Sequence, residues 1–437
     1  MEWQWLLVII FGILVLLMLS GMPIAFTFMI INVAGVFVFF GGTAGLEQLI
    51  LSMSTSLTTF VLLPVALFIL MGELLVHSNI AIDMMDALDK LLGRLPGRLS
   101  LLAVATGTVI AALTGSSMSS TAMLGQILVP EMEKRGYQKA MTVGPIMASG
   151  GLAIMIPPSS LAILLCVIGE ISIGRILVVI PFVGLILAIL LAAYIIIRCK
   201  LQPSLAPTYE VQKVPLSTRI FGAVKYVLPV GFIIFLVVGL IFVGVADPSE
   251  SAATGTIGMV IVILFYRRLN WRVVKKSING AITITGMVFL IIAGATTFGQ
   301  ILAFSGATSG LSEFATRLPL PPILIIVAMQ IIILIMGCFM EVVAIMMITL
   351  PIFLPVVNQL GFDPIWFGAM TLLNIECAFI TPPFGLNLFV MRGVAPSGTT
   401  MEDVYLASLP MVGINCLTIA LMMAFPPLVL WPIRLMG

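Results

Sequence analysis

Charged side chains are scarce in this sequence. Asp, Glu, Lys and Arg make up 9% of its 437 residues, whereas a soluble domain carries about 25%. Hydrophobic residues make up 61% of the chain, and its mean hydropathy is +1.25. This composition excludes a soluble globular protein. It predicts an all-α polytopic membrane protein, because a spanning helix satisfies its own backbone hydrogen bonds in lipid.

The sequence has one histidine and no pair of cysteines with C-x-x-C spacing. His77 is the only histidine, which excludes an H-E-x-x-H zinc site and Ser–His chemistry. The five cysteines are scattered without C-x-x-C spacing, so we interpret them as free thiols. The sequence has no Gly-Lys pair and therefore no P-loop. We expect neither an enzyme nor an organic cofactor, and no binding to nucleic acid.

Apolar runs of about 20 residues predict helices that span a lipid bilayer. They cover residues 4–20, 24–40, 55–77, 140–169, 174–198, 223–246, 251–267, 278–303, 365–391 and 404–432. Two further stretches, 99–133 and 322–357, each carry a Gly-led break near the middle. Each is either two spans or one re-entrant hairpin, and the short halves with polar tips favour the hairpin. Segments 83–95 and 309–318 are predicted to form surface helices.

The basic residues predict the orientation of the chain. If the N-terminus faces outside, all but three of the 20 Lys and Arg residues fall in cytoplasmic segments. The three exceptions are Arg175, Arg317 and Arg434. This distribution agrees with the positive-inside rule. It does not distinguish hairpins from paired spans, since both give the same sidedness.

Proline spacing indicates an internal repeat. Pro130 and Pro157 are 27 residues apart, and so are Pro355 and Pro382. Five predicted spans separate the two copies, and an odd number inverts the second copy. Inverted repeats with broken helices are typical of secondary transporters, whose site lies between the copies. The hairpins and the broken helices 140–169 and 365–391 would form that site.

A broken helix exposes carbonyl groups that suit a cation and N–H groups that suit an anion. Our hypothesis is two Na⁺ sites, one per hairpin and broken helix, beside one substrate site. The predicted Na⁺-binding residues are Gly115, Ser116, Ser117, Ser119, Pro157, Gly337, Met340, Glu341, Thr381, Pro382 and Asn387. The predicted substrate-binding residues are Ser120, Thr121, Ser159, Ser160, Phe384 and Gly385.

Two acidic residues, Glu341 and Glu376, lie at membrane depth. Intramembrane carboxylates are costly, so each is a candidate to complete a cation site or to carry a proton. The alternative is a hydrogen-bonded structural carboxylate. Glu73 and Glu170 lie near span ends, and we interpret them as interfacial. No Lys or Arg lies at the midplane, so an anionic substrate would be held by N–H groups, hydroxyls and bound cations.

Four segments, 21–26, 113–121, 156–160 and 381–387, resemble the large permease subunit of TRAP (tripartite ATP-independent periplasmic) transporters of the dicarboxylate-permease type. The family belongs to the ion-transporter superfamily, and the resemblance covers essentially the whole chain. It implies a Na⁺-coupled elevator-type importer in the bacterial inner membrane. It also implies a small four-helix membrane subunit and a periplasmic substrate-binding protein as partners. The implied substrate is an organic anion such as a C4-dicarboxylate or a sialic acid.

The predicted organisation has five parts. Residues 1–54 form N-terminal scaffold helices, 55–198 the first repeat, 199–277 a cytoplasmic linker with connecting scaffold helices, 278–400 the second repeat, and 401–437 a C-terminal helix. Hairpins and broken helices would move against the scaffold. The main alternative is an H⁺-coupled organic-anion transporter that uses Glu341 and Glu376. A channel and an intramembrane enzyme are further alternatives, and the enzyme lacks the motifs named above.

Overall fold

The computed structural model describes residues 3–92, 95–114, 117–157, 159–207 and 215–436. All regular elements in these ranges are helices, which confirms the predicted all-α class. Six of the described helices are long and apolar enough to cross a membrane, and the number rises to eight if two bent helix pairs each count as one span. The predicted inversion of the repeats and the domain boundaries stay predictions.

The N-terminal part differs from the prediction at one place. Its helices are α1 (Trp3–Leu19), α2 (Ile24–Phe39), α3 (Thr43–Leu57), η1 (Phe60–Leu62) and α4 (Leu63–Ser78). The span expected over 55–77 is wrong, because the chain forms α3 first and starts α4 only at Leu63. Pro64 occupies the first turn of α4, where its missing N–H group costs nothing.

The next part contains the first hairpin and the first broken helix. Its helices are α5 (Ile80–Leu92), α6 (Arg98–Thr114), α7 (Ser117–Lys134), α8 (Lys139–Gly150), α9 (Leu152–Met155), α10 (Ser160–Ile168), α11 (Ile173–Leu201) and η2 (Pro203–Leu205). Helices α6 and α7 cover the stretch 99–133 and pack against each other, and its re-entrant character stays a prediction. The predicted break within 140–169 is confirmed, since the axis bends by 53° between Lys139–Met155 and Ser160–Ile168.

The C-terminal part contains the second predicted hairpin stretch and the second predicted break. Its helices are α12 (Leu216–Phe242), α13 (Pro248–Phe265), α14 (Trp271–Phe304), α15 (Ala307–Arg317), α16 (Pro322–Gly337), α17 (Val342–Gln359), α18 (Pro364–Phe379), α19 (Leu386–Val394), α20 (Met401–Ala424) and α21 (Pro427–Arg434). The single span expected over 404–432 is wrong. Phe425 leaves the helical conformation before Pro426, because a residue before proline disfavours it, and a new helix starts at Pro427.

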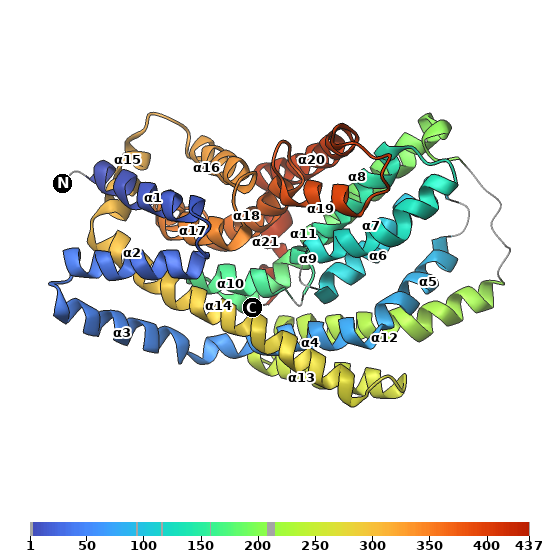
Figure 1. The fold of residues 1–437 in the computed structure, drawn as a ribbon, viewed down its shortest axis with the longest axis horizontal. Coiled ribbons are helices and arrows are strands. Elements are labelled where there is room, and N and C mark those ends of the chain that lie inside the picture. The colour runs from blue at the N-terminus through green and yellow to red at the C-terminus, as the bar shows by residue number, and fades with distance from the viewer. Residues whose placement is uncertain (1–2, 93–94, 115–116, 158, 208–214, 437) are drawn as a thin grey trace.

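The helices form two groups (Figure 1). Helices α3, α4, α12 and α13 lie along one side, while the hairpins, the broken helices and α20 lie along the other. Helix α4 packs against α13 and α14. Helix α10, the second half of the first broken helix, contacts α4 and α14 from one group and α17 and α18 from the other. It therefore bridges the two groups.

The first halves of both broken helices form the centre of the core. Every residue of α8 from Met141 to Gly150 is buried, and so is every residue of α18 from Ile365 to Phe379. A helix buried on all sides is expected to be apolar all round. Polar residues in these two helices are therefore informative, and Glu376 is the acidic one.

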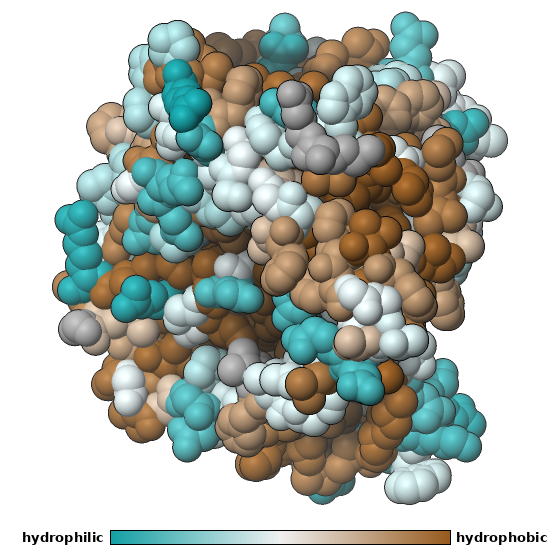
Figure 2. Space-filling view, turned by 90° about the vertical axis from the view of Figure 1, so that its left-hand side faces the viewer, coloured by the Kyte–Doolittle hydropathy of each residue, from teal (hydrophilic) through white to brown (hydrophobic). Residues whose placement is uncertain are grey.

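The end of the molecule that carries α1, α2 and α15 has a mixed surface. Figure 2 shows hydrophilic residues spread over this end among hydrophobic ones. Such a surface suits a face in contact with water. The helix flanks expose large apolar side chains instead, among them Phe232 and Phe235 on α12 and Ile257 and Ile261 on α13, as expected for helices in contact with lipid.

Candidate substrate and cation site

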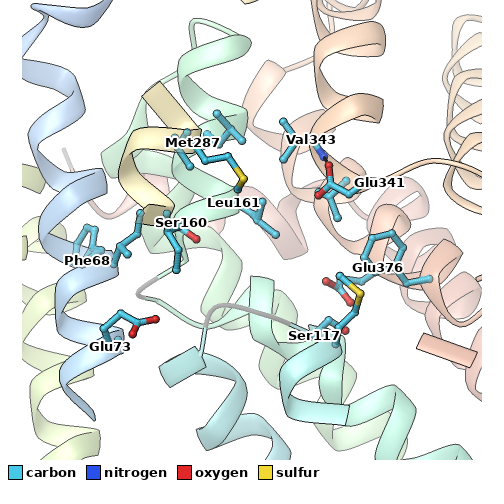
Figure 3. Close-up of a pocket in the computed structure, with 17 residues that line it drawn as sticks. Phe68, Glu73, Ser117, Ser160, Leu161, Met287, Glu341, Val343 and Glu376 are labelled. Carbon is cyan, nitrogen blue, oxygen red and sulfur yellow. Dashed lines mark hydrogen bonds between the residues drawn. The ribbon is translucent and has the colours of Figure 1, made fainter. Parts of the chain in front are cut away.

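A cavity of about 240 Å³ lies where the two groups of helices meet (Figure 3). Helices α4, α7, α10, α14, α17 and α18 line it with Phe68, Ile69, Gly72, Glu73, Ser117, Met118, Ser160, Leu161, Leu164, Ile284, Met287, Val288, Glu341, Val342, Val343, Glu376 and Phe379. Both hairpins and both broken helices therefore contribute to one cavity. Helices α4 and α14 close its other side.

The tip of the first hairpin is joined to the second broken helix. The side-chain amide of Asn387 donates a hydrogen bond of 2.6 Å to the hydroxyl of Ser117. Ser117 begins α7, and Asn387 lies in the first turn of α19. Both side chains are buried. The sequence analysis placed these residues in different hairpin-and-helix pairs, whereas the structure brings them together.

The end of α8 approaches the same point closely. A Cβ atom on Gly150 would lie 2.5 Å from Oγ1 of Thr121 and 2.9 Å from the carbonyl oxygen of Ser117. A Cβ atom on Gly151 would lie 3.3 Å from Oε2 of Glu376. At Gly150 any larger residue would force the hairpin tip to shift, and at Gly151 the contact would be tight. The Gly150-Gly151 pair was missed in the sequence analysis, although a glycine pair inside an apolar span was its visible signal.

Four buried oxygens gather in this region without hydrogen-bond partners among the described residues. They are Oγ1 of Thr121, Oδ1 of Asn387 and both carboxylate oxygens of Glu376. Glu376 is 2% exposed, and its carboxylate lies beside Ser117 in Figure 3. An unsatisfied buried oxygen costs about 1–3 kcal/mol. An all-oxygen set of hydroxyl, amide and carboxylate groups suits a small hard cation. We call Ser117, Thr121, Glu376 and Asn387 the oxygen cluster.

Glu341 behaves differently from Glu376. It precedes α17, and its Oε2 accepts a hydrogen bond of 3.0 Å from the N–H group of Val343. The carboxylate therefore caps the helix and interacts favourably with its N-terminal end. Of the two membrane-depth acids, Glu376 is the one whose carboxylate oxygens, beside Ser117, have no hydrogen bond of normal distance and angle within the described part of the chain.

Glu73 lies near the C-terminal end of α4, and its interpretation as an interfacial residue stays a prediction. Glu73 lines the central cavity from α4. Its Oε2 lies 3.2 Å from Nε2 of His77, one turn further along the helix. The helical distance from Glu73 to the end of α4 is little more than one turn, so the sequence suggested a position at the membrane surface.

At the first break, helix α10 begins beside the central cavity. Ser159 accepts a hydrogen bond of 3.2 Å from the N–H group of Ala162 and so caps α10, while Ser160 lines the cavity. Ser120, Thr121 and Pro157 are buried. Ser119 lies in α7. Gly115 and Ser116 lie outside the described residues.

The second break packs against the second hairpin rather than lining the central cavity. A Cβ atom on Gly337 would collide with the Cβ atom of Ala378, so the tip of this hairpin lies directly on α18. The Phe339 and Phe384 rings are 5.3 Å apart between centroids. Six predicted residues of this region are absent from the described cavity lining: Gly337, Met340, Thr381, Pro382, Phe384 and Gly385.

Some of these six residues have local structural roles. The Thr381 hydroxyl donates a hydrogen bond of 2.7 Å to the carbonyl oxygen of Cys377, at the end of α18. A Cβ atom on Gly385 would lie 2.5 Å from the carbonyl oxygen of Phe379. The second break is therefore closely packed, and the structure brings together fewer of its predicted ligands than at the first hairpin.

Known proteins match this chain over most of its length. A family model described as "Tripartite ATP-independent periplasmic transporter, DctM component" matches residues 11–428. The chain belongs to this family. It is 32% identical to the C4-dicarboxylate TRAP transporter large permease protein DctM of Pseudomonas aeruginosa, over 78% of this chain and 80% of that protein. The resemblance noted in the sequence is thereby confirmed.

Other relatives widen the comparison. The ectoine TRAP transporter large permease protein TeaC of Halomonas elongata is 26% identical, over 95% of this chain and 96% of that protein. The crystal structure of the Alcanivorax borkumensis YdaH transporter is similar in fold, with a TM-score of 0.62, 14% identity, and coverage of 92% of this chain and 96% of that one. The chain is thus a multi-pass inner-membrane TRAP permease, and its relatives are transporters rather than enzymes.

Proposed function

We propose that this TRAP permease imports an organic anion by Na⁺-coupled secondary transport, with the central cavity as the substrate site. The oxygen cluster beside that cavity is the observation that carries the proposal. Its unpaired oxygens form a site for Na⁺. A bound Na⁺ would supply the positive charge that these buried oxygens have no other partner to provide. Both hairpins and both broken helices line the central cavity, as expected at the midplane site of a transporter with repeats.

The charges around the cavity explain why cation and anion would bind together. Three carboxylates line it, those of Glu73, Glu341 and Glu376, and none of the described lining residues is Lys or Arg. The charged side chains that an anion would meet among the described lining residues are all negative. Bound Na⁺ removes that repulsion, so each ligand raises the affinity of the other. This reciprocal effect is thermodynamic coupling.

Helix starts provide the direct contacts for the anion. Helix α7 begins at Ser117, α10 at Ser160 and α17 at Val342, and each of these first residues lines the cavity. The N-terminal end of a helix carries partial positive charge and free N–H groups. The N-terminal ends of α7 and α10 suit a carboxylate substrate, whereas that of α17 already has the Glu341 carboxylate as its cap.

The movement we propose is an elevator motion. The hairpins, acting as re-entrant elements, and the broken helices would carry the cavity past the scaffold helices α4 and α14. The cavity lies between these two groups, which supports this division. The surface helices α5 and α15 would brace the moving part. In this arrangement the N-terminus is periplasmic.

The proposed partners follow from the family. A tripartite system implies a small four-helix membrane subunit and a periplasmic substrate-binding protein. Relatives are named for C4-dicarboxylate and for ectoine. For this chain we propose a carboxylate such as a C4-dicarboxylate or a sialic acid.

The test is uptake by the whole transporter in liposomes. The chain would be reconstituted with the small subunit and the binding protein encoded beside it, and supplied with labelled succinate and labelled sialic acid in separate assays. An inward Na⁺ gradient should drive uptake, a K⁺ gradient should not, and a protonophore should leave Na⁺-driven uptake intact. Uptake that is equal with Na⁺ and K⁺ would contradict Na⁺ coupling.

One observation favours a second candidate, H⁺ coupling. Glu376 is buried without a hydrogen-bond partner among the described residues, and a proton would neutralise it as Na⁺ would. In that case the protonophore would abolish uptake and removal of Na⁺ would not.

A further inference from the structure

A second cavity, of about 360 Å³, lies where α4 ends and α14 begins. It is lined by Val76, His77, Asn79, Asn270, Arg272, Val273 and Lys276. We call it the basic cavity. It shares no described lining residue with the central cavity. The transport mechanism proposed above makes no use of it.

The charges of the basic cavity have one sign. Arg272 and Lys276 lie one turn apart on α14, and neither forms an ion pair with a carboxylate of the described residues. No acidic residue is among its described lining. Asp83 forms an ion pair with Arg268 at 2.6 Å, and Oε2 of Glu73 lies 3.2 Å from Nε2 of His77. The cavity therefore offers uncompensated positive charge to a ligand.

Its walls are fixed by hydrogen bonds within the protein. The Arg268 guanidinium donates to the carbonyl oxygen of Asn79 at 2.7 Å and pairs with Asp83 at 2.6 Å. Asn79 has a left-handed backbone with φ of 57°, so this interaction holds a sharp corner between α4 and α5. On the other wall, Asn270 caps α14 by accepting from the N–H group of Val273 at 3.0 Å. Basic groups on a preformed wall bind an anion at a lower entropic cost.

The residues around the basic cavity indicate the source of an anion that would bind in it. Trp271, beside Arg272, is 78% exposed, and Ile278 and Ile282 are exposed further along α14. Tryptophan at a helix end is typical of the membrane–water interface, and apolar side chains beyond it suit acyl chains. The positive-inside distribution puts this end of α14 in the cytoplasm. Basic pockets between helices on that side bind phospholipid headgroups in other membrane proteins.

We propose that the basic cavity binds a phosphate-bearing anion at the cytoplasmic face, with Arg272 and Lys276 as its charged contacts. The neighbouring apolar surface favours the headgroup of an anionic phospholipid as the source. Free phosphate has the same chemistry, and the experiment below separates the two sources. The proposal does not rest on Na⁺ coupling or on the identity of the transported substrate.

The experiment measures lipid binding to the purified full-length chain. Native mass spectrometry would count the lipids retained from detergent micelles containing phosphatidylglycerol or phosphatidylcholine. Thermal unfolding would be followed in the same micelles, and in lipid-free detergent with added inorganic phosphate. The test variant is Arg272→Gln with Lys276→Gln. The matched control is Arg267→Gln with Lys275→Gln, which removes two exposed basic residues of the same region outside the cavity lining.

The wild type and the control should retain phosphatidylglycerol in preference to phosphatidylcholine and unfold at a higher temperature with it. The test variant should bind phosphatidylglycerol about thirtyfold more weakly, since each of the two basic residues near the membrane surface contributes about fivefold. Stabilisation of the wild type by inorganic phosphate alone, lost in the test variant, would support the same site with a soluble ligand.

Two results would overturn the proposal. One is a wild type that neither prefers phosphatidylglycerol nor responds to phosphate, and this result does not depend on any variant folding. The other is a test variant that retains phosphatidylglycerol as tightly as the control.

Discussion

The side-chain amide of Asn387 donates a hydrogen bond of 2.6 Å to the hydroxyl of Ser117 across 270 residues of sequence. This bond joins the tip of the first hairpin to the second broken helix. It orients Asn387 so that its remaining oxygen, Oδ1, is buried and unpaired among the described residues. The bond therefore organises the oxygen cluster from both halves of the chain.

Replacing Asn387 by Ala should weaken the apparent Na⁺ affinity of uptake by about tenfold or more, because it removes an oxygen ligand and leaves Ser117 without its donor. Ser117→Ala should have a similar effect. The measurement is the Na⁺ dependence of uptake by the complete transporter in liposomes. Asn415→Ala is the matched control, since Asn415 is a buried asparagine that donates to Met411 within α20. Unchanged Na⁺ dependence in both cluster variants would contradict the assignment.

Glu376→Gln should abolish cation-driven uptake while the protein still folds. Glutamine keeps the size of the side chain but removes the charge that a cation would neutralise. Burying an uncharged amide costs less free energy than burying a carboxylate. The melting temperature should therefore stay the same or rise. Uptake and thermal unfolding are measured together. Glu313→Gln, an exposed glutamate on α15, should leave both unchanged. Normal Na⁺-driven uptake in Glu376→Gln would remove Glu376 from the mechanism.

Gly150→Ala tests the close approach of α8 to the hairpin tip. The added methyl group would meet Oγ1 of Thr121 and the carbonyl oxygen of Ser117, and crowding of this kind costs about 1–3 kcal/mol. We expect a lower melting temperature and a weaker Na⁺ response. Gly413→Ala in α20 has open space around its Cβ position and serves as the control. Equal behaviour of the two variants would show that the hairpin tip has room that the structure does not indicate.

Gly337→Ala tests the contact between the second hairpin and α18. Its methyl group would collide with the side chain of Ala378, so the hairpin tip must shift away from the broken helix. Uptake should fall at every Na⁺ concentration. The reason is that the displaced element, the second hairpin, belongs to the group of helices that we propose to move. The double variant Gly337→Ala with Ala378→Gly should recover part of the activity by restoring the space. Failure of this rescue would argue against direct packing as the cause.

Much of the helical framework could be predicted from the sequence. Long apolar runs gave most of the spans, and Pro157 and Pro382 indicated where two of them break. Local chemistry explains the errors. The Ser- and Thr-rich segment that ends α3 lacks an apolar run, so α3 was missed, and the apolar run over 404–432 hid the break before Pro426.

The site was less predictable than the framework. Sequence reasoning found Ser117, Glu376 and Asn387 because polar residues are rare at membrane depth. It could not place Asn387 against Ser117, since spacing along the chain does not say which half of a repeat faces which. It also could not place Glu73 in the cavity, because the depth of a cavity depends on how helices cross.

The most direct measurement is equilibrium binding of radioactive sodium to the purified full-length chain, compared with Ser117→Ala and Asn387→Ala. The account predicts saturable binding by the wild type that excess unlabelled Na⁺ displaces and K⁺ does not. It predicts that each variant loses most of this binding, while Asn415→Ala keeps it. Binding that is equally strong in both cluster variants, or no binding by the wild type, would contradict the account.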